Sequence, residues 1–426
     1  MFDRDRWQEI FSAIKQNKLR SALTAFGVFW GIFMLVTMTG AGNALLNGMT
    51  EGMKDFATNS GFVWTNNTTK AYKGFKQGRW WEFDNDDMEA IRRGVPEVDI
   101  LAPKLQGWNI SGGENVVRGL KTGSFTVNGE VPEYNLIDPN EMVYGRYINE
   151  MDILHKRKVC VIGERVYEVM FDKGQDPTGE YLRVSGVWFQ VIGVAKTKNP
   201  NIQIGANKEE VVSLPFSTMQ QTFNYGDRVH FFGFTAHDGE SVAETVEKVT
   251  ALLKERHSVA PDDLEASGHV NVEEMVKTMG YAFLGISVLI WIVGIGTLIA
   301  GAVGVSNIML VIVRERTKEI GIQRAIGAKP LTIVGQILTE SVFLTTIAGF
   351  LGLAFGTLVL QLADVAIKAA EAANTSDQGT FFKNPEIGLP MALMSLGILI
   401  VIGFFAGLIP ARKAIRIKPI EALRYE

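Results

Sequence analysis

The chain has 426 residues, of which 47% are apolar and 21% charged, and its formal net charge is −4. The acidic balance argues against nucleic-acid binding, and a single cysteine, Cys160, excludes an internal disulfide. Because these averages are near those of globular proteins, a membrane protein can be recognised here only from how the apolar residues are distributed.

Four long runs of the sequence contain no charged residue. They are Ala22–Thr50, Thr278–Val313, Ser341–Ala363 and Ile387–Ala411, and they hold 29, 36, 23 and 25 residues. A bilayer core of about 30 Å needs roughly 20 apolar residues in a helix, whereas helices of globular proteins average about 11–12 residues. The runs therefore predict four transmembrane helices, at 22–50, 278–313, 341–363 and 387–411.

Basic residues predict the orientation of these helices. Five Lys or Arg residues lie in each of three segments, namely 1–21, 314–340 and 412–426, whereas the link 364–386 contains two. Short basic segments stay in the cytoplasm. We therefore expect a multi-pass protein of the bacterial inner membrane with both termini and 314–340 inside. The first span is too long for a signal-peptide core and should act as an uncleaved anchor.

The segment 51–277, which this topology places outside the cytoplasm, is predicted to be a mixed α/β domain. It carries 25 basic and 34 acidic residues. Strand-like runs rich in β-branched and aromatic residues alternate with helix-like runs at Asn85–Arg93, Glu164–Phe171 and Ser241–Arg256. The predicted fold is thus an α-helical bundle of four transmembrane helices, with a large mixed α/β extracytoplasmic domain inserted between helices 1 and 2.

Apolar residues at helical spacing continue from the spans into this domain. Such spacings occur where packed helices meet, and they predict a pair of stalk helices that carries the domain. The residues are Leu46, Met49, Met53 and Phe56 on one side and Val272, Val276, Met279 and Phe283 on the other.

The four spans contain no Asp, Glu, Lys, Arg or His. Proton- and ion-driven transporters usually place such residues inside the membrane, so the composition argues against that class. Small residues do recur at intervals of four, which lets helix backbones approach closely. The predicted helix-packing residues are Gly27, Gly31, Gly296, Ala300, Gly304, Gly352, Gly356, Gly403 and Gly407.

The sequence predicts no catalytic, cofactor-binding or metal-binding residue. It has no Gly-x-Ser-x-Gly elbow, and its five histidines lack metal-ligand spacing. Gly174–Gly179 comes nearest to a phosphate loop, but Glu180 follows where that loop requires lysine. The acidic cluster Asp84, Asp86 and Asp87 is interpreted as the start of a helix, where carboxylates complement the helix dipole.

The most specific stretch is RERTKEIGIQRAIGAKP, Arg314–Pro330. It predicts a short cytoplasmic helix with a small apolar face formed by Ile322, Ala325 and Ile326; Gly327 suits its C-cap, and Pro330 suits the first turn of the third span. The stretch resembles the signature of MacB/FtsX-type permeases, which is close to R-x-x-E-I-G-x-x-R-A-x-G-A. The matching residues are Arg316, Glu319, Ile320, Gly321, Arg324, Ala325, Gly327 and Ala328.

The resemblance covers essentially the whole chain. The opening Asn17–Ile32, the stretches Tyr144–Val166 and Gly186–Ala195, and the ending Pro410–Glu426 are similar to the corresponding parts of the family. It implies a homodimer or paired permease that works with a cytoplasmic ABC ATPase, which binds ATP and Mg while this chain binds no cofactor. The eight signature residues would couple the permease to that ATPase. Because residue 1 almost opens the membrane domain, the ATPase is expected on a separate chain.

Two functions are compatible with this resemblance. The first is an export permease, which drives an antibiotic, peptide, toxin or lipoprotein outward through movement of its periplasmic domain; a periplasmic adaptor and an outer-membrane channel would complete tripartite efflux. The alternative is an FtsX-like signalling permease that regulates cell-wall hydrolases without transport. The large size of segment 51–277 favours export, since FtsX-like exported domains are much smaller. Membrane lipid is the remaining predicted partner.

Overall fold

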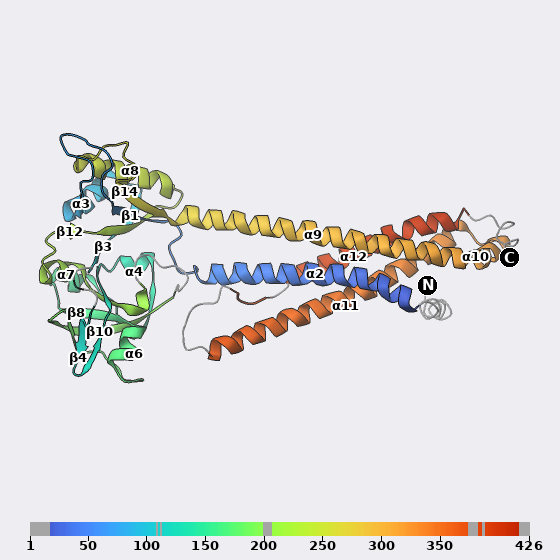
Figure 1. Cartoon of the computed structure of the whole chain (residues 1–426), viewed down its shortest axis with the longest axis horizontal. Helices are drawn as coiled ribbons and strands as arrows, with labels where there is room; N and C mark the ends of the chain where they lie inside the picture. Colours follow the sequence, from blue (N-terminus) through green and yellow to red (C-terminus); the bar gives the residue numbers. More distant parts are fainter. Residues whose placement is uncertain are drawn as a thin grey trace. The chain divides into compact units, whose positions relative to one another are not determined.

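The computed structural model describes residues 18–107, 110, 113–198, 207–373, 382–385 and 388–416. The chain divides into two compact units, Thr50–Gly280 and Met1–Met49 with Tyr281–Glu426 (Figure 1). The predicted cytoplasmic segment 1–21 lies mostly outside the described residues. So do the end of the predicted tail, from residue 417, and much of the predicted loop 364–386.

The unit Thr50–Gly280 is built on one mixed sheet of twelve described strands. Its order is β14-β1-β13-β3-β6-β11-β8-β10-β9-β4-β5, and β7 pairs with β10. β8 and β10 are parallel, as are β6 and β11, whereas the other pairs are antiparallel. The strands are β1 (Ser60–Thr65), β3 (Val98–Gln106), β4 (Val116–Arg118), β5 (Lys121–Gly123), β6 (Thr126–Glu130), β7 (Asn140–Gly145), β8 (Val159–Gly163), β9 (Tyr181–Val184), β10 (Val187–Thr197), β11 (Val211–Pro215), β13 (Phe231–Ala236) and β14 (Ser267–Asn271).

Short helices and a second small sheet complete this unit. β2 (Phe83–Asp84) pairs with β12 (Arg228–Val229). The helices are α3 (Asn85–Gly94), α4 (Tyr134–Ile137), α5 (Glu150–Leu154), α6 (Glu164–Met170), the 3₁₀ turn η1 (Lys208–Glu210), α7 (Phe216–Thr222) and α8 (Val242–Arg256). The predicted helical runs correspond to α3, α6 and α8. The apolar run Tyr181–Val194 is divided between β9 and β10, because Ser185 and Gly186 turn the chain with positive φ angles of 43° and 90°.

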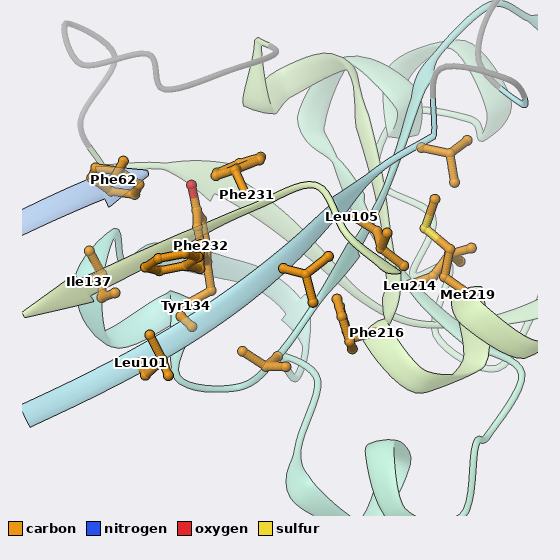
Figure 2. Close-up of a cluster of buried hydrophobic side chains, with 14 of the residues drawn as sticks. Phe62, Leu101, Leu105, Tyr134, Ile137, Leu214, Phe216, Met219, Phe231 and Phe232 are labelled. Atoms are coloured by element: carbon orange, nitrogen blue, oxygen red, sulfur yellow. The ribbon is translucent and has the colours of Figure 1, made fainter. Parts of the chain in front are cut away.

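Large apolar side chains from most of the sheet form the core of this unit. Figure 2 shows part of it, where Phe62, Phe232 and Tyr134 lie together and Leu105 lies near Leu214. Cys160 is fully buried in β8. Burial raises the pKa of its thiol, so the thiolate form is disfavoured and the residue acts as a small apolar side chain.

An ion pair is buried beside the pairing of β3 with β6. Lys104 Nζ lies 2.6 Å from Glu130 Oε1, and both side chains are only 6% exposed. The hydroxyl of Tyr147 donates to Glu130 at 2.5 Å, and Lys104 lies 3.9 Å from the centre of the Tyr134 ring. Burial acts to raise the pKa of Glu130, but the charge of Lys104 holds it below its usual value. Burial raises the pKa of Tyr134 to about 12.

The other unit contains the four predicted membrane helices. They are α2 (Lys18–Glu51), α9 (Val272–Glu315), α11 (Pro330–Ala373) and α12 (Leu389–Ala414), with the short helix α10 (Thr317–Ala325) between the second and third. Each of the four contains a stretch long and apolar enough to cross a membrane. At 1.5 Å per residue the 44 residues of α9 extend about 66 Å, which exceeds the bilayer core.

The predicted stalk pairing is wrong at its outer residues. α2 ends at Glu51, directly before Gly52, so Met53 and Phe56 lie beyond the helix. Phe56 and Val272 are buried in the core of the sheet unit, and Met53 and Val276 pack against it. Their regular spacing reflects contact with that core rather than a seam between two helices.

Six of the predicted packing glycines lie where membrane helices touch. Gly27 and Gly31 of α2 face α9, Gly352 and Gly356 of α11 face α2, and Gly403 and Gly407 of α12 face α11. The closest approach of backbones is at Gly352, where an added Cβ would lie 2.5 Å from the carbonyl oxygen of Phe29. At the α11–α12 contact, the hydroxyl of Ser341 donates to the carbonyl of Gly403 at 2.9 Å.

The remaining stripe of small residues on α9 differs from the other six. No atom of the described chain other than the helix itself lies within 4 Å of a Cβ built on Gly296 or Gly304, and Ala300 is exposed. Within the described chain, α9 packs against α2 through Gly301 and Gly294 instead. Gly296 and Gly304 share one face of α9, and Gly294 and Gly301 share another. The sequence pattern does not show which of these two faces packs against a neighbouring helix.

Candidate functional site

The connector, defined here as Arg314–Pro330, folds as a sharply bounded short helix. α9 ends at Glu315, α10 occupies Thr317–Ala325, and α11 begins at Pro330. Gly327 has a φ of +103°. The amide of Gly327 donates to the carbonyl of Arg324 at 3.2 Å, and that of Ala328 donates to Gln323 at 3.0 Å. This is a Schellman C-cap, so the glycine ends α10 at a defined residue.

Arg316 of the connector is paired within the chain. Arg316 Nη1 lies 3.0 Å from Oε1 of Glu340 on α11, and its Nε lies 4.0 Å from Glu319. Glu340 is only 6% exposed, whereas the Glu319 side chain is 73% exposed. Arg316 therefore attaches the beginning of α10 to α11.

Arg324, in the last turn of α10, makes a different contact. Arg324 Nη1 donates to the backbone carbonyl of Ile415 at 2.7 Å. Ile415 is the C-cap residue of α12, and the last carbonyls of a helix have no partner within that helix. The guanidinium of Arg324 therefore reaches the end of α12, and the coupling of the signature residues to an ATPase stays a prediction.

The eight signature residues separate into an inner and an outer group. Ile320 and Gly321 are buried, and Arg316, Arg324 and Ala328 are partly buried. Glu319, Ala325 and Gly327 are exposed. The motif therefore serves two purposes locally, because one group fixes α10 to the bundle and the other faces outward.

Apolar side chains are left uncovered on the connector. Ile322 is 41% exposed, Ile326 is 83% exposed, and Leu331, at the start of α11, is 81% exposed. The polar residues Gln323 and Lys329, also exposed, alternate with them. Exposed apolar residues grouped within a polar surface mark a site of interaction. Ile322 and Ile326 belong to the apolar face predicted from the sequence, whereas Leu331 and Glu340 are not marked by any sequence pattern.

One cluster of potential metal ligands occurs among the described residues, in the sheet unit. Asp84, Asp87 and His257 approach one another there. Asp87 already accepts from Arg256 Nε at 2.7 Å and contacts His257 Nε2 at 2.6 Å, and it forms a capping box with Asp84 at the start of α3. Burial acts to raise the pKa of Asp87, but the hydrogen bonds to His257 and Arg256 lower it. The cluster is thus a satisfied structural network.

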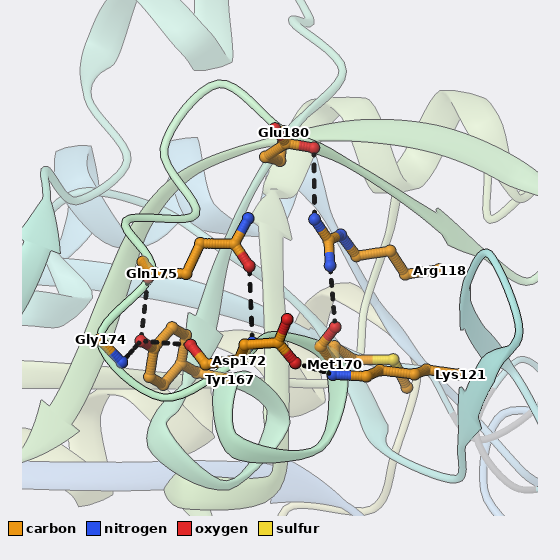
Figure 3. A network of polar contacts seen from close by, with 8 residues as sticks. All are labelled: Arg118, Lys121, Tyr167, Met170, Asp172, Gly174, Gln175 and Glu180. Carbon is orange, nitrogen blue, oxygen red and sulfur yellow. Dashed lines mark hydrogen bonds and ion pairs between the residues drawn. The ribbon is translucent and has the colours of Figure 1, made fainter.

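The stretch Gly174–Gly179 forms a closed loop around a tyrosine (Figure 3). The amide of Gly174 donates to the hydroxyl of Tyr167 at 3.0 Å, and that hydroxyl donates to the carbonyl of Gln175 at 2.9 Å. Glu180 lies 3.5 Å from Arg118. Phosphate loops direct successive amides at an anion, whereas here an amide at the start of the loop is bound to Tyr167.

Comparison with known proteins gives matches over nearly the whole chain. Residues 21–252 match the family model of the MacB-like periplasmic core domain, and residues 291–419 match that of the FtsX-like permease C-terminal domain. A pyoverdine export ATP-binding/permease protein, PvdT of Pseudomonas entomophila, is 29% identical over 96% of this chain and 58% of its own length. A macrolide export ATP-binding/permease protein, MacB of Chlorobaculum tepidum, is 28% identical over 98% of this chain and 61% of its own length. This chain therefore spans about three-fifths of these relatives.

A solved structure is also similar to part of the chain. The periplasmic region of MacB from Actinobacillus actinomycetemcomitans aligns over 55% of this chain and 97% of that one, with 16% identity and a TM-score of 0.42.

Proposed function

The chain belongs to the family of MacB/FtsX-type permeases, and from this we propose that it is the permease of an ABC transporter that exports its substrate by moving its periplasmic domain. Family membership and the four long apolar helices support a multi-pass permease of the inner membrane. The uncovered apolar residues Ile322, Ile326 and Leu331 carry the proposal, because they offer a docking surface next to a helix that is fastened to the bundle. We assign this surface to a cytoplasmic ABC ATPase on a partner chain.

The orientation and the partners follow from the same proposal. The connector and both termini face the cytoplasm, since they hold the excess of Lys and Arg. Two copies of the chain, or this chain and a second permease chain, bind two ATPase subunits on the cytoplasmic side. The ATPase subunits bind ATP and Mg. The relatives named for pyoverdine and macrolide export support a substrate of the antibiotic, peptide, toxin or lipoprotein class, with a periplasmic adaptor and an outer-membrane channel completing the route. The match of residues 21–252 to the periplasmic core domain favours export over an FtsX-like signalling role.

The purified chain alone should not hydrolyse ATP. Glu180 rather than lysine directly follows Gly174–Gly179, and the Gly174 amide already donates to the hydroxyl of Tyr167. Phosphate release would be measured with detergent-solubilised protein. Any hydrolysis that is detected should disappear when contaminating ATPases are removed by a second purification step. ATP hydrolysis that stays proportional to the amount of this chain would contradict the proposal.

Ile326→Asp should abolish stable binding of the cytoplasmic ABC ATPase that co-purifies with the wild-type chain. A carboxylate at the centre of an apolar contact loses burial energy and becomes an unpaired buried charge. Leu264→Asp is the matched control, because Leu264 is also 83% exposed but lies in the sheet unit. Co-purification after co-expression measures binding. Equal recovery of the ATPase with wild type and with Ile326→Asp would contradict the assignment of the connector as the docking surface.

A further inference from the structure

The short helix α10 is attached to two other helices by one arginine near each of its ends. Arg316, at its N-cap, is paired with Glu340 of α11 at 3.0 Å. Arg324, in its last turn, donates to the Ile415 carbonyl of α12 at 2.7 Å. We propose that these two contacts form a clamp that carries displacement of α10 into the third and fourth membrane helices. The inference deepens the proposed function, since it names the route of force inside the permease.

The first contact is strong because it is shielded from water. Glu340 is 6% exposed, and the Arg316 side chain is 24% exposed. A charged hydrogen bond in such a place is stronger than one between exposed groups. Removing Arg316 would leave the Glu340 carboxylate buried and lacking this cation, which is far more costly than losing a surface pair. The contact therefore resists separation of α10 from α11.

The second contact reaches a helix with no short covalent link to the connector. α11 follows α10 after a few residues, but α12 begins at Leu389, after the whole of α11. Movement of α10 reaches α12 directly only through contacts in space, and the Arg324–Ile415 hydrogen bond is one of these. The positive guanidinium also complements the negative C-terminal end of the α12 dipole. The bond thus has both a defined geometry and an electrostatic preference.

Apolar packing between the two arginines completes the attachment. Ile320, in the middle of α10, is 8% exposed and belongs to the buried cluster of the membrane helices together with Ile333 and Ile337 of α11. Gly321 beside it is buried as well. The inner side of α10 is therefore held along its length, while Ile322 and Ile326 remain uncovered. A partner that moves the uncovered side must move α11 and α12 with it.

A spin label on α10 tests the clamp in the full-length chain without any partner. The label is placed at the exposed position Lys318→Cys, in a background with Cys160→Ser. With the wild-type pair the label should be less mobile than in either single variant. Arg316→Glu and Glu340→Arg should each make the label more mobile, and the double variant should return its mobility toward the wild-type value because it re-forms the pair with reversed charges. The milder Glu340→Gln, which keeps the shape, should be intermediate. Unchanged mobility in both single variants, or a double variant no better than either, would overturn the clamp.

Reconstitution with the cytoplasmic ABC ATPase that co-purifies with the wild-type chain tests the transmission of force. The single variants should still bind the ATPase, because Ile322, Ile326 and Leu331 are unchanged, but stimulation of hydrolysis by the permease should fall at least about fivefold, the lower end of typical coupling. Arg324→Leu should act likewise, and Arg324→Lys should retain part of the stimulation. Full stimulation in Arg316→Glu, Glu340→Arg and Arg324→Leu would overturn the proposed route. If wild type itself fails to bind the ATPase, the proposed function fails, while the spin-label result still decides whether the clamp exists.

Discussion

Lys104→Met should lower the free energy of unfolding of the periplasmic domain by about 3–5 kcal/mol, the usual cost of breaking a buried ion pair from one side. Glu130 would keep its hydrogen bond from Tyr147 but lose the ammonium group 2.6 Å away. The double variant Lys104→Met with Glu130→Leu should recover much of the loss, because neither charge then remains buried.

Pulse proteolysis of the detergent-solubilised chain in urea would measure this change. Lys248→Met is the control, because Lys248 forms an ion pair with Glu97 but its side chain is 51% exposed, and exposed pairs contribute about 0–1 kcal/mol. In Lys104→Met the folded-state pKa of Glu130 should rise above its unfolded value, so the deficit should shrink as the pH falls from 8 toward 5. Equal, small effects of Lys104→Met and Lys248→Met would show that the buried pair is not a determinant of stability.

Gly352→Ala should destabilise the membrane helices by about 1–3 kcal/mol, the range for overpacking. The added Cβ would lie 2.5 Å from the carbonyl oxygen of Phe29 and 3.3 Å from Cβ of Ile32. The first neighbour is backbone and cannot rotate away, so α11 and α2 would have to separate. Gly352→Leu should have a larger effect for the same reason.

Thermal unfolding followed by circular dichroism in detergent would compare these variants. Gly397→Ala is the control: Gly397 is also a glycine of a membrane helix, but no atom of the described chain outside its own helix lies within 4 Å of its added Cβ. Alanine favours a helix over glycine, so the control should melt at the wild-type temperature or slightly above it. If Gly352→Ala and Gly397→Ala had the same melting temperature, α2 and α11 would not approach as closely as described.

Local sequence patterns are enough to predict the class of this protein and the local form of its connector. Uncharged runs of 23 to 36 residues predict membrane helices, because partition into a bilayer depends on the composition of one segment. The end of α10 is also local, since Gly327 can adopt the positive φ that a helix cap requires. The family signature is local too, because all eight of its residues lie within the connector Arg314–Pro330.

The residues that these local features contact depend on the folded arrangement of the whole chain. Arg316 pairs with Glu340, 24 residues away, and Arg324 reaches Ile415, 91 residues away; neither partner is marked by spacing or composition. Gly352 meets a neighbouring backbone whereas Gly296 meets nothing in the described chain, although both belong to patterns of small residues. Phe56 and Val272 likewise join the core of the sheet unit rather than a stalk seam. Such outcomes depend on packing between segments far apart in the chain, because a local pattern specifies that a face is apolar or closely packed but not which surface covers it.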